Sequence, residues 1–120
     1  MKILIVDDSR VMRQIVTRAL RQAGFTGHEL VEATDGLGGL RAFNAEAPEL
    51  ILSDWSMPEM NGLELLTALR ARGENVPFAF VTWERSTEVL ARAEAAGAMA
   101  VIPKPFTAEA MRSVLHPVLG

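Results

Sequence analysis

Four short apolar runs in this chain are each followed by polar side chains that could do chemistry. Asp7 and Asp8 follow the first run, Asp54 comes one residue after the second, Thr82 follows the third and Lys104 lies just beyond the fourth. Ligands of open α/β sheets bind outside the carboxyl ends of the strands, so these side chains should meet at one edge of a sheet. The spacing therefore predicts a site with three carboxylates, one hydroxyl and one ammonium group.

Three carboxylates at one edge call for a cation. They repel one another, so at least one should have a raised pKa unless a positive ion lies between them. Mg²⁺ suits the set best, because few protein oxygens leave room for water and phosphate oxygens around the ion. We expect Asp8 to bind the ion directly, Asp7 directly or through water, and Asp54 to complete the acidic set. Mn²⁺ is an expected substitute.

The same residues suit phosphoryl transfer. Charge on the transferred group spreads over its equatorial oxygens, so catalysis consists mostly of positioning and electrostatic stabilisation. Asp54, on the central run, is the predicted nucleophile and would form an acyl phosphate. Lys104 would neutralise one phosphoryl oxygen. Thr82 would donate a hydrogen bond to another and would report phosphorylation by moving.

The apolar runs predict the strands that position these residues. They do not alternate polar and apolar side chains, which is typical of parallel strands buried on both faces. Strands are expected at residues 3–6, 50–52, 78–81 and 99–102, with a weaker candidate at 29–33.

Helical patterns lie between the strands. A stripe of period 3.6 predicts a first helix that Gly24 can close, and Pro48 lies beyond the end of a second. Asn61 can cap a third helix, with Glu64 as its capping-box partner. The predicted apolar faces of these three helices consist of Val11, Met12, Ile15, Val16, Ala19 and Leu20; Leu37, Leu40 and Phe43; and Leu63, Leu66 and Leu69.

Two further helices complete the alternation of strand and helix. The fourth should start at Ser86 or Thr87 and reach about residue 97. Thr107 can cap the fifth, which Pro117 should end or distort near residue 116. Five β-α units predict an α/β fold: a doubly wound, five-stranded parallel sheet with right-handed crossovers, in a single domain over residues 1–120.

Composition excludes several classes of function. The chain has 120 residues, 49% of them hydrophobic, and a formal net charge of -3. It has no cysteine, so a zinc-thiolate site or a thiol nucleophile is impossible. No basic run suggests binding to nucleic acid. No apolar run is long enough to cross a membrane and no signal peptide is visible, so a cytoplasmic location is expected.

Four blocks of the chain resemble those of bacterial response-regulator receiver domains. They are ILIVDDS at 3–9, LSDWSMPEMNG at 52–62, Thr82, and KPF at 104–106. The resemblance covers essentially the whole chain, and all four blocks are correctly spaced on alternating strands and helices. The stretch after Ser53 is especially similar to the CheY-like chemotaxis regulators within this family, whose flavodoxin-like fold matches the expected sheet.

The resemblance implies roles that spacing does not show. A sensor histidine kinase would phosphorylate Asp54, and the main-chain carbonyl of Ser56 would complete the metal site. The Lys104-Pro105 bond would be cis. The output would be a shift of the face formed by the fourth helix, the last strand and the fifth helix, about residues 86–115, which would regulate a partner protein. The chain would be a phosphorylation switch in two-component signalling that catalyses its own phosphotransfer and dephosphorylation, rather than a classical enzyme.

Two positions depart from the family pattern. Val101 stands where many receivers carry Tyr or Phe, so only Thr82 carries over from the usual pair of switch residues. Trp83 follows Thr82 where a small residue is usual, and we predict that its ring slows access of small phosphodonors or water.

Three alternatives stay open. The chain could be the receiver part of a larger regulator with a DNA-binding or enzymatic output domain. It could be a receiver that is never phosphorylated. A Mg²⁺-dependent phosphatase of the haloacid-dehalogenase type is less favoured, because that family needs an Asp-x-Asp pair and Asp7 and Asp8 are adjacent.

Overall fold

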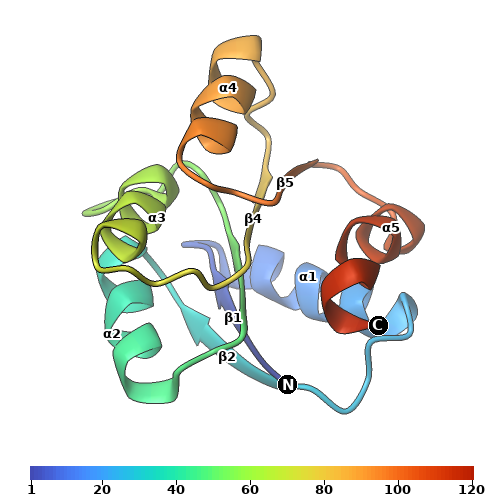
Figure 1. The fold of residues 1–120 in the computed structure, drawn as a ribbon. Helices are drawn as coiled ribbons and strands as arrows, with labels where there is room; N and C mark the ends of the chain where they lie inside the picture. Colours follow the sequence, from blue (N-terminus) through green and yellow to red (C-terminus); the bar gives the residue numbers. More distant parts are fainter.

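The computed structural model describes residues 1–120 and contains one parallel sheet with the strand order β2-β1-β3-β4-β5. β3, which leads to Asp54, is the central strand and has two strands on each side. Five helices alternate with the strands, which confirms the predicted (βα)5 fold (Figure 1). The strands are β1 (Lys2–Val6), β2 (Glu29–Ala33), β3 (Leu50–Ser53), β4 (Phe78–Thr82) and β5 (Ala100–Pro103).

Each helix begins after a residue whose side chain accepts a hydrogen bond from one of the free backbone N–H groups in the first turn. Asn61 and Glu64 form the predicted capping box, with bonds of 2.8 and 3.0 Å between side chain and backbone. The other N-caps are Ser9, Asp35, Ser86 and Thr107, each of which accepts from a backbone N–H three residues on. The helices are α1 (Arg10–Gln22), α2 (Gly36–Glu46), α3 (Gly62–Ala71), α4 (Thr87–Ala95) and α5 (Ala108–Leu119).

Helices cover both faces of the sheet (Figure 1). Alternate residues of the strands pack against α1 and α5 on one face, in a core that includes Ile3, Leu52 and Met111. The other alternate residues face α2, α3 and α4, in a core that includes Phe78 and Phe80. The three central strands are buried along almost their whole length, as their unbroken apolar runs predict.

The last strand is less buried than predicted. It begins at Ala100, and Met99, which was expected to lie in it, is 38% exposed. The physical reason is position: β5 is an edge strand, paired only with β4, and most of its residues are partly exposed.

Three predicted helix faces were partly wrong. In α1 the buried residues are Val16, Ala19 and Leu20, whereas Val11 and Ile15 are exposed. These two side chains face solvent, outside the core that α1 forms with the sheet. In α3 the buried leucines are Leu65, Leu66 and Leu69, and Leu63 is only partly buried. In α2 only Phe43 of the predicted stripe is buried, beside Gly36 and Gly39.

Pro117 does not end the fifth helix, which continues to Leu119. A proline removes one backbone donor, but near the end of a helix this costs a single bond. The helical hydrogen bonds continue after Pro117, because Gly120 N donates to His116 O at 2.8 Å. None of the five helices combines the length and hydropathy that a bilayer crossing requires.

Candidate functional site

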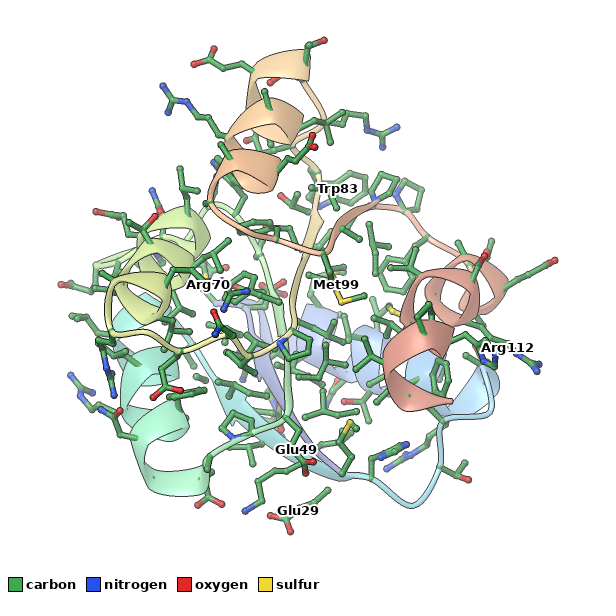
Figure 2. All side chains as sticks on the ribbon, viewed as in Figure 1. Glu29, Glu49, Arg70, Trp83, Met99 and Arg112 are labelled. Atoms are coloured by element: carbon green, nitrogen blue, oxygen red, sulfur yellow. The ribbon has the colours of Figure 1, made fainter.

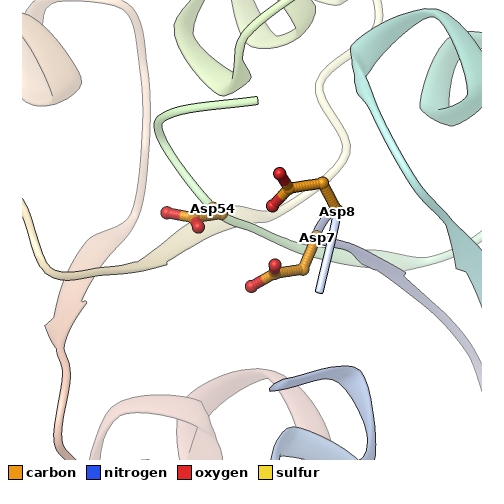
Figure 3. A group of neighbouring side chains, drawn as sticks. All are labelled: Asp7, Asp8 and Asp54. Carbon is orange, nitrogen blue, oxygen red and sulfur yellow. The ribbon is translucent and has the colours of Figure 1, made fainter. Parts of the chain in front are cut away.

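The predicted acidic residues meet at the carboxyl end of the two central strands. Asp7 and Asp8 follow β1, Asp54 follows β3, and these strands pair in parallel with Val6 opposite Ser53. One carboxylate oxygen from each aspartate lies within 4.8 Å of the other two. Figure 3 shows the three carboxylates directed to the same side of the sheet edge. Parallel pairing thus brings together residues 46 or 47 positions apart in the sequence.

Lys104 joins two of these carboxylates. Its Nζ lies 3.0 Å from Asp7 Oδ2 and 3.2 Å from Asp54 Oδ2, and the residue is 2% exposed. A buried ammonium group needs such partners, because an unpaired buried charge is strongly unfavourable. The chain brings Lys104 there by pairing β5 with β4, and Lys104 N donates to Thr82 O at 2.9 Å.

The pKa of Asp7 is raised above its ordinary value. The largest cause is burial, which disfavours the charged carboxylate, and the nearby Asp54 carboxylate contributes least. Hydrogen bonds from Ser9 N, at 2.9 Å, and from Lys104 oppose the rise. The expectation of a raised pKa is therefore met, but repulsion between carboxylates is the smaller part of the reason.

Asp54 is held by its own backbone surroundings. Its amide donates to Val6 O at 2.9 Å, and its Oδ1 accepts from Trp55 N at 2.6 Å. Gly62 passes so close that an added Cβ would lie 2.1 Å from Asp54 O, so only glycine fits there. The carboxylate remains partly exposed, with Oδ2 on Lys104, so an incoming group can reach it.

Thr82 ends β4 with its side chain buried at the same edge of the sheet. Its Oγ1 accepts from Glu84 N at 3.2 Å, which leaves the hydroxyl hydrogen free to donate. The structure shows no hydrogen bond between Thr82 and Asp54. The hydroxyl is thus in place to serve as a donor to a group that arrives later.

Three other predicted site residues lie apart from these contacts. Ser56 is exposed on the loop after Asp54. Trp83 is 60% exposed on the loop between β4 and α4 (Figure 2), and no hydrogen bond joins its side chain to Asp54. Val101 is half-buried and lines an apolar groove of about 400 Å³ between α4 and β5, with Leu90 and Met99. Gating by Trp83 and switching at Val101 therefore stay predictions.

The sequence did not indicate two arginines that donate hydrogen bonds to the backbone of site residues. Arg13 Nη1 donates to Asp7 O at 2.7 Å, and Arg85 donates to the carbonyl oxygen of Lys104. Both donors act on backbone oxygens, which every residue carries, so no pairing pattern in the sequence indicates them. The one available signal for Arg13 is its place on the helix that follows the acidic pair.

The donor set fits a hard divalent cation. All three candidate ligands are carboxylate oxygens, and no nitrogen or sulfur ligand lies among them. With Lys104 counted against the three aspartates, two formal negative charges remain, which a divalent ion would balance. The predicted cis peptide bond between Lys104 and Pro105 is present.

Comparisons with known proteins agree with this geometry. The family model described as the response regulator receiver domain matches residues 3–116. The chain is 38% identical to the chemotaxis protein CheY of Pseudomonas aeruginosa, over 98% of this chain and 95% of that protein. It is 37% identical to chemotaxis protein CheY1 of Helicobacter pylori strain J99, over 100% of this chain and 98% of that protein.

A solved structure shows the same arrangement. The chemotaxis protein CheY4 of Vibrio cholerae superposes with a TM-score of 0.85 at 35% identity, and the match covers 98% of both chains. This likeness spans all five β-α units rather than a local motif.

Proposed function

The chain belongs to the response regulator receiver domain family, and from this premise we propose that Asp54 accepts a phosphoryl group from a histidine kinase in a Mg²⁺-dependent reaction. The observation that carries the proposal is the bridge from Lys104 Nζ to Asp7 and Asp54 inside the cluster of three carboxylates. This is the charge arrangement that a transferring phosphoryl group requires. The receiver unit would span residues 1–120.

The proposed step uses the chain's own groups in stated roles. A carboxylate oxygen of Asp54 attacks phosphorus, the bond from phosphorus to the donor's imidazole nitrogen breaks, and that nitrogen keeps the electron pair. Lys104, already 3.2 Å from Asp54 Oδ2, stays beside the new acyl phosphate and neutralises one oxygen. Thr82 turns its free hydroxyl hydrogen toward another.

Mg²⁺ would be held by Asp7, Asp8 and Asp54, with the main-chain carbonyl of Ser56 as a further ligand. When bound, the ion would offset the charge of the phosphoryl oxygens, and Mn²⁺ should substitute for it. Lys104 keeps Asp7 oriented for this role, while burial excludes bulk water from one side of the cluster.

The output would pass through the face formed by α4, β5 and α5 to a partner protein. Support comes from contacts that connect this face to the site: Thr82 accepts from Glu84, and Lys104 accepts from Arg85, just before the N-cap of α4. The relatives named above are chemotaxis proteins, so a chemotaxis output is the favoured proposal.

The test is to incubate the protein with Mg²⁺ and acetyl phosphate and to weigh it intact. We expect one added phosphoryl group, which Asp54→Asn prevents. An adduct that persists in Asp54→Asn, or no adduct either with acetyl phosphate or with a cognate kinase, would contradict the proposal. In the same assay Trp83→Ala should load and lose the group faster, if the exposed indole slows small molecules as predicted.

A further inference from the structure

One of the three site carboxylates has no hydrogen bond of its own. Asp7 accepts from Ser9 N and Lys104, and Asp54 accepts from Trp55 N and Lys104. The carboxylate of Asp8 accepts none and is exposed. Its place in the cluster therefore depends on the backbone that carries it.

Arg13 holds that backbone. Its Nη1 donates to the main-chain oxygen of Asp7 at 2.7 Å, and this oxygen belongs to the planar peptide that leads into Asp8. Its Nε donates to Glu32 Oε1, on β2, at 2.8 Å. The Arg13 side chain is only 12% exposed, so the guanidinium is confined between these two acceptors.

Arg13 thus connects three parts of the chain behind the acidic pair: helix α1, the end of β1 and the edge strand β2. Ile5 pairs with Glu32 in the sheet, so Glu32 is fixed beside a residue that lies two positions before Asp7. The planar guanidinium can serve both acceptors at once because its donors have a rigid geometry. Glu32 also balances the charge of Arg13, which would otherwise act on a cation nearby.

We propose that Arg13, oriented by Glu32, is a positioning residue of the metal site: it fixes the peptide between Asp7 and Asp8 so that the Asp8 carboxylate is already in place when Mg²⁺ arrives. The proposal rests on the function proposed above. It goes beyond it, because neither residue is a ligand or touches a phosphoryl group. Outer partners of this kind commonly affect metal affinity by roughly tenfold or more.

The sign of the effect separates positioning from charge. Removal of a positive charge near a cation site should by itself tighten Mg²⁺ binding, because repulsion falls. Removal of Arg13 should weaken it, because the Asp8 carboxylate is no longer held. We expect Arg13→Ala to raise the Mg²⁺ dissociation constant by roughly tenfold.

Binding is measured by titration with MgCl₂, followed by Trp55 fluorescence in a Trp83→Phe background and by calorimetry. Trp55 is a suitable reporter, since its amide donates to Asp54 Oδ1. The matched control is Arg18→Ala. Arg18 lies on the same helix but forms no hydrogen bond or ion pair with Asp7 or Asp8, so its removal should leave the dissociation constant unchanged or lower it. Arg13→Lys keeps the charge but not the two-acceptor geometry, so it should also bind Mg²⁺ more weakly.

Arg13 could instead serve the fold alone. In that case Arg13→Ala would lower the thermal unfolding midpoint equally with and without Mg²⁺, and the dissociation constant would not change; this result overturns the inference. If Arg13→Ala does not fold, Arg13→Lys, which keeps the charge, decides between the same two outcomes. A wild-type protein that binds no Mg²⁺ overturns the proposed metal role of the cluster together with this inference, whereas normal wild-type binding with unaltered variants overturns the inference only.

Discussion

Lys104 decides the charge balance of the site at the scale of single residues. Its ammonium is buried between Asp7 and Asp54, so neither carboxylate is left as an isolated charge. Asp7 remains costly to ionise, since burial raises its pKa. Without metal, Lys104 therefore stabilises the cluster only in part. A bound cation would further stabilise the ionised carboxylates.

Asp7 should make stability depend on pH in metal-free buffer. Its pKa is raised in the folded protein above the ordinary value of 3.8. At a pH between the ordinary and the raised value, the folded state therefore keeps a proton that the unfolded state has lost. Stability attributable to Asp7 must therefore fall as pH rises from that value through the raised pKa. Asp7→Asn lacks this loss, so the free energy of unfolding of the variant should increase relative to that of the wild type as pH rises above 3.8. Denaturant titrations in EDTA measure the difference; a difference independent of pH would contradict the prediction.

Gly62→Ala should destabilise the protein. The added methyl carbon would meet Asp54 O at 2.1 Å and the ring of Phe80 at 2.9 Å, and neither a backbone oxygen just beyond β3 nor a core ring can move freely. A cost of about 1–3 kcal/mol in the free energy of unfolding is expected from such overpacking. The phosphorylation rate should fall as well, since Asp54 would be displaced.

Gly38→Ala is the matched control for this change. Gly38 also lies in a helix, but its nearest neighbours to an added Cβ are 3.3 and 3.7 Å away. Denaturant unfolding should show little loss or a small gain, because alanine favours helix. Equal losses for the two variants would mean that the contact with Asp54 O is not the cause.

At the scale of helices and strands, hydrogen bonds between two loops connect parts of the site. The loop from β4 to α4 carries Glu84, which donates to Thr82, and also Arg85, which donates to the carbonyl of Lys104 on the loop from β5 to α5. Two segments of the site are thereby tied together directly before helix α4 begins. The tie therefore links the loop that carries Lys104 to the segment just before α4.

Arg85→Ala should loosen both loops together. Amide hydrogen exchange should rise at residues 83–87 and at residues 104–107, because local opening costs less once the tie is removed. Arg92→Ala is the control: it removes an equal charge from α4, where Arg92 pairs only with the exposed Glu88. Faster exchange in the first segment alone would show that Arg85 does not restrain the Lys104 loop.

The whole molecule concentrates its chemistry at one edge of a sheet whose interior is apolar. The central strands are buried on both faces, so the polar residues that follow them are held at fixed separations by the packed core. Opening the fold would disperse the acidic cluster. Metal binding and folding should therefore be linked.

Mg²⁺ should raise the stability of the folded chain. A ligand that binds only the folded state adds about 2.7 kcal/mol when its concentration is 100 times its dissociation constant. Thermal unfolding with MgCl₂ against EDTA measures the gain, and Asp8→Asn should reduce it by weakening the site. NaCl at matched ionic strength is the control, and an equal gain with NaCl would mean that screening rather than binding is responsible.

The order of elements and the identity of the site residues follow from the sequence alone. Unbroken apolar runs indicate buried parallel strands, and the residues just beyond them must share an edge, so their positions in the chain are enough to group Asp7, Asp8, Asp54, Thr82 and Lys104. The capping residues of α3 were equally visible, because a capping box depends on residues only three apart.

Tertiary structure alone decided which groups hold the site in place. Exposure of Val11 and Ile15, the partial exposure of β5 and the continuation of α5 past Pro117 depend on what lies beside each element, which local periodicity does not contain. The same holds for Arg13 on the carbonyl of Asp7 and Arg85 on the carbonyl of Lys104. A backbone oxygen looks the same at every position of a sequence, and only the fold determines which side chain reaches it.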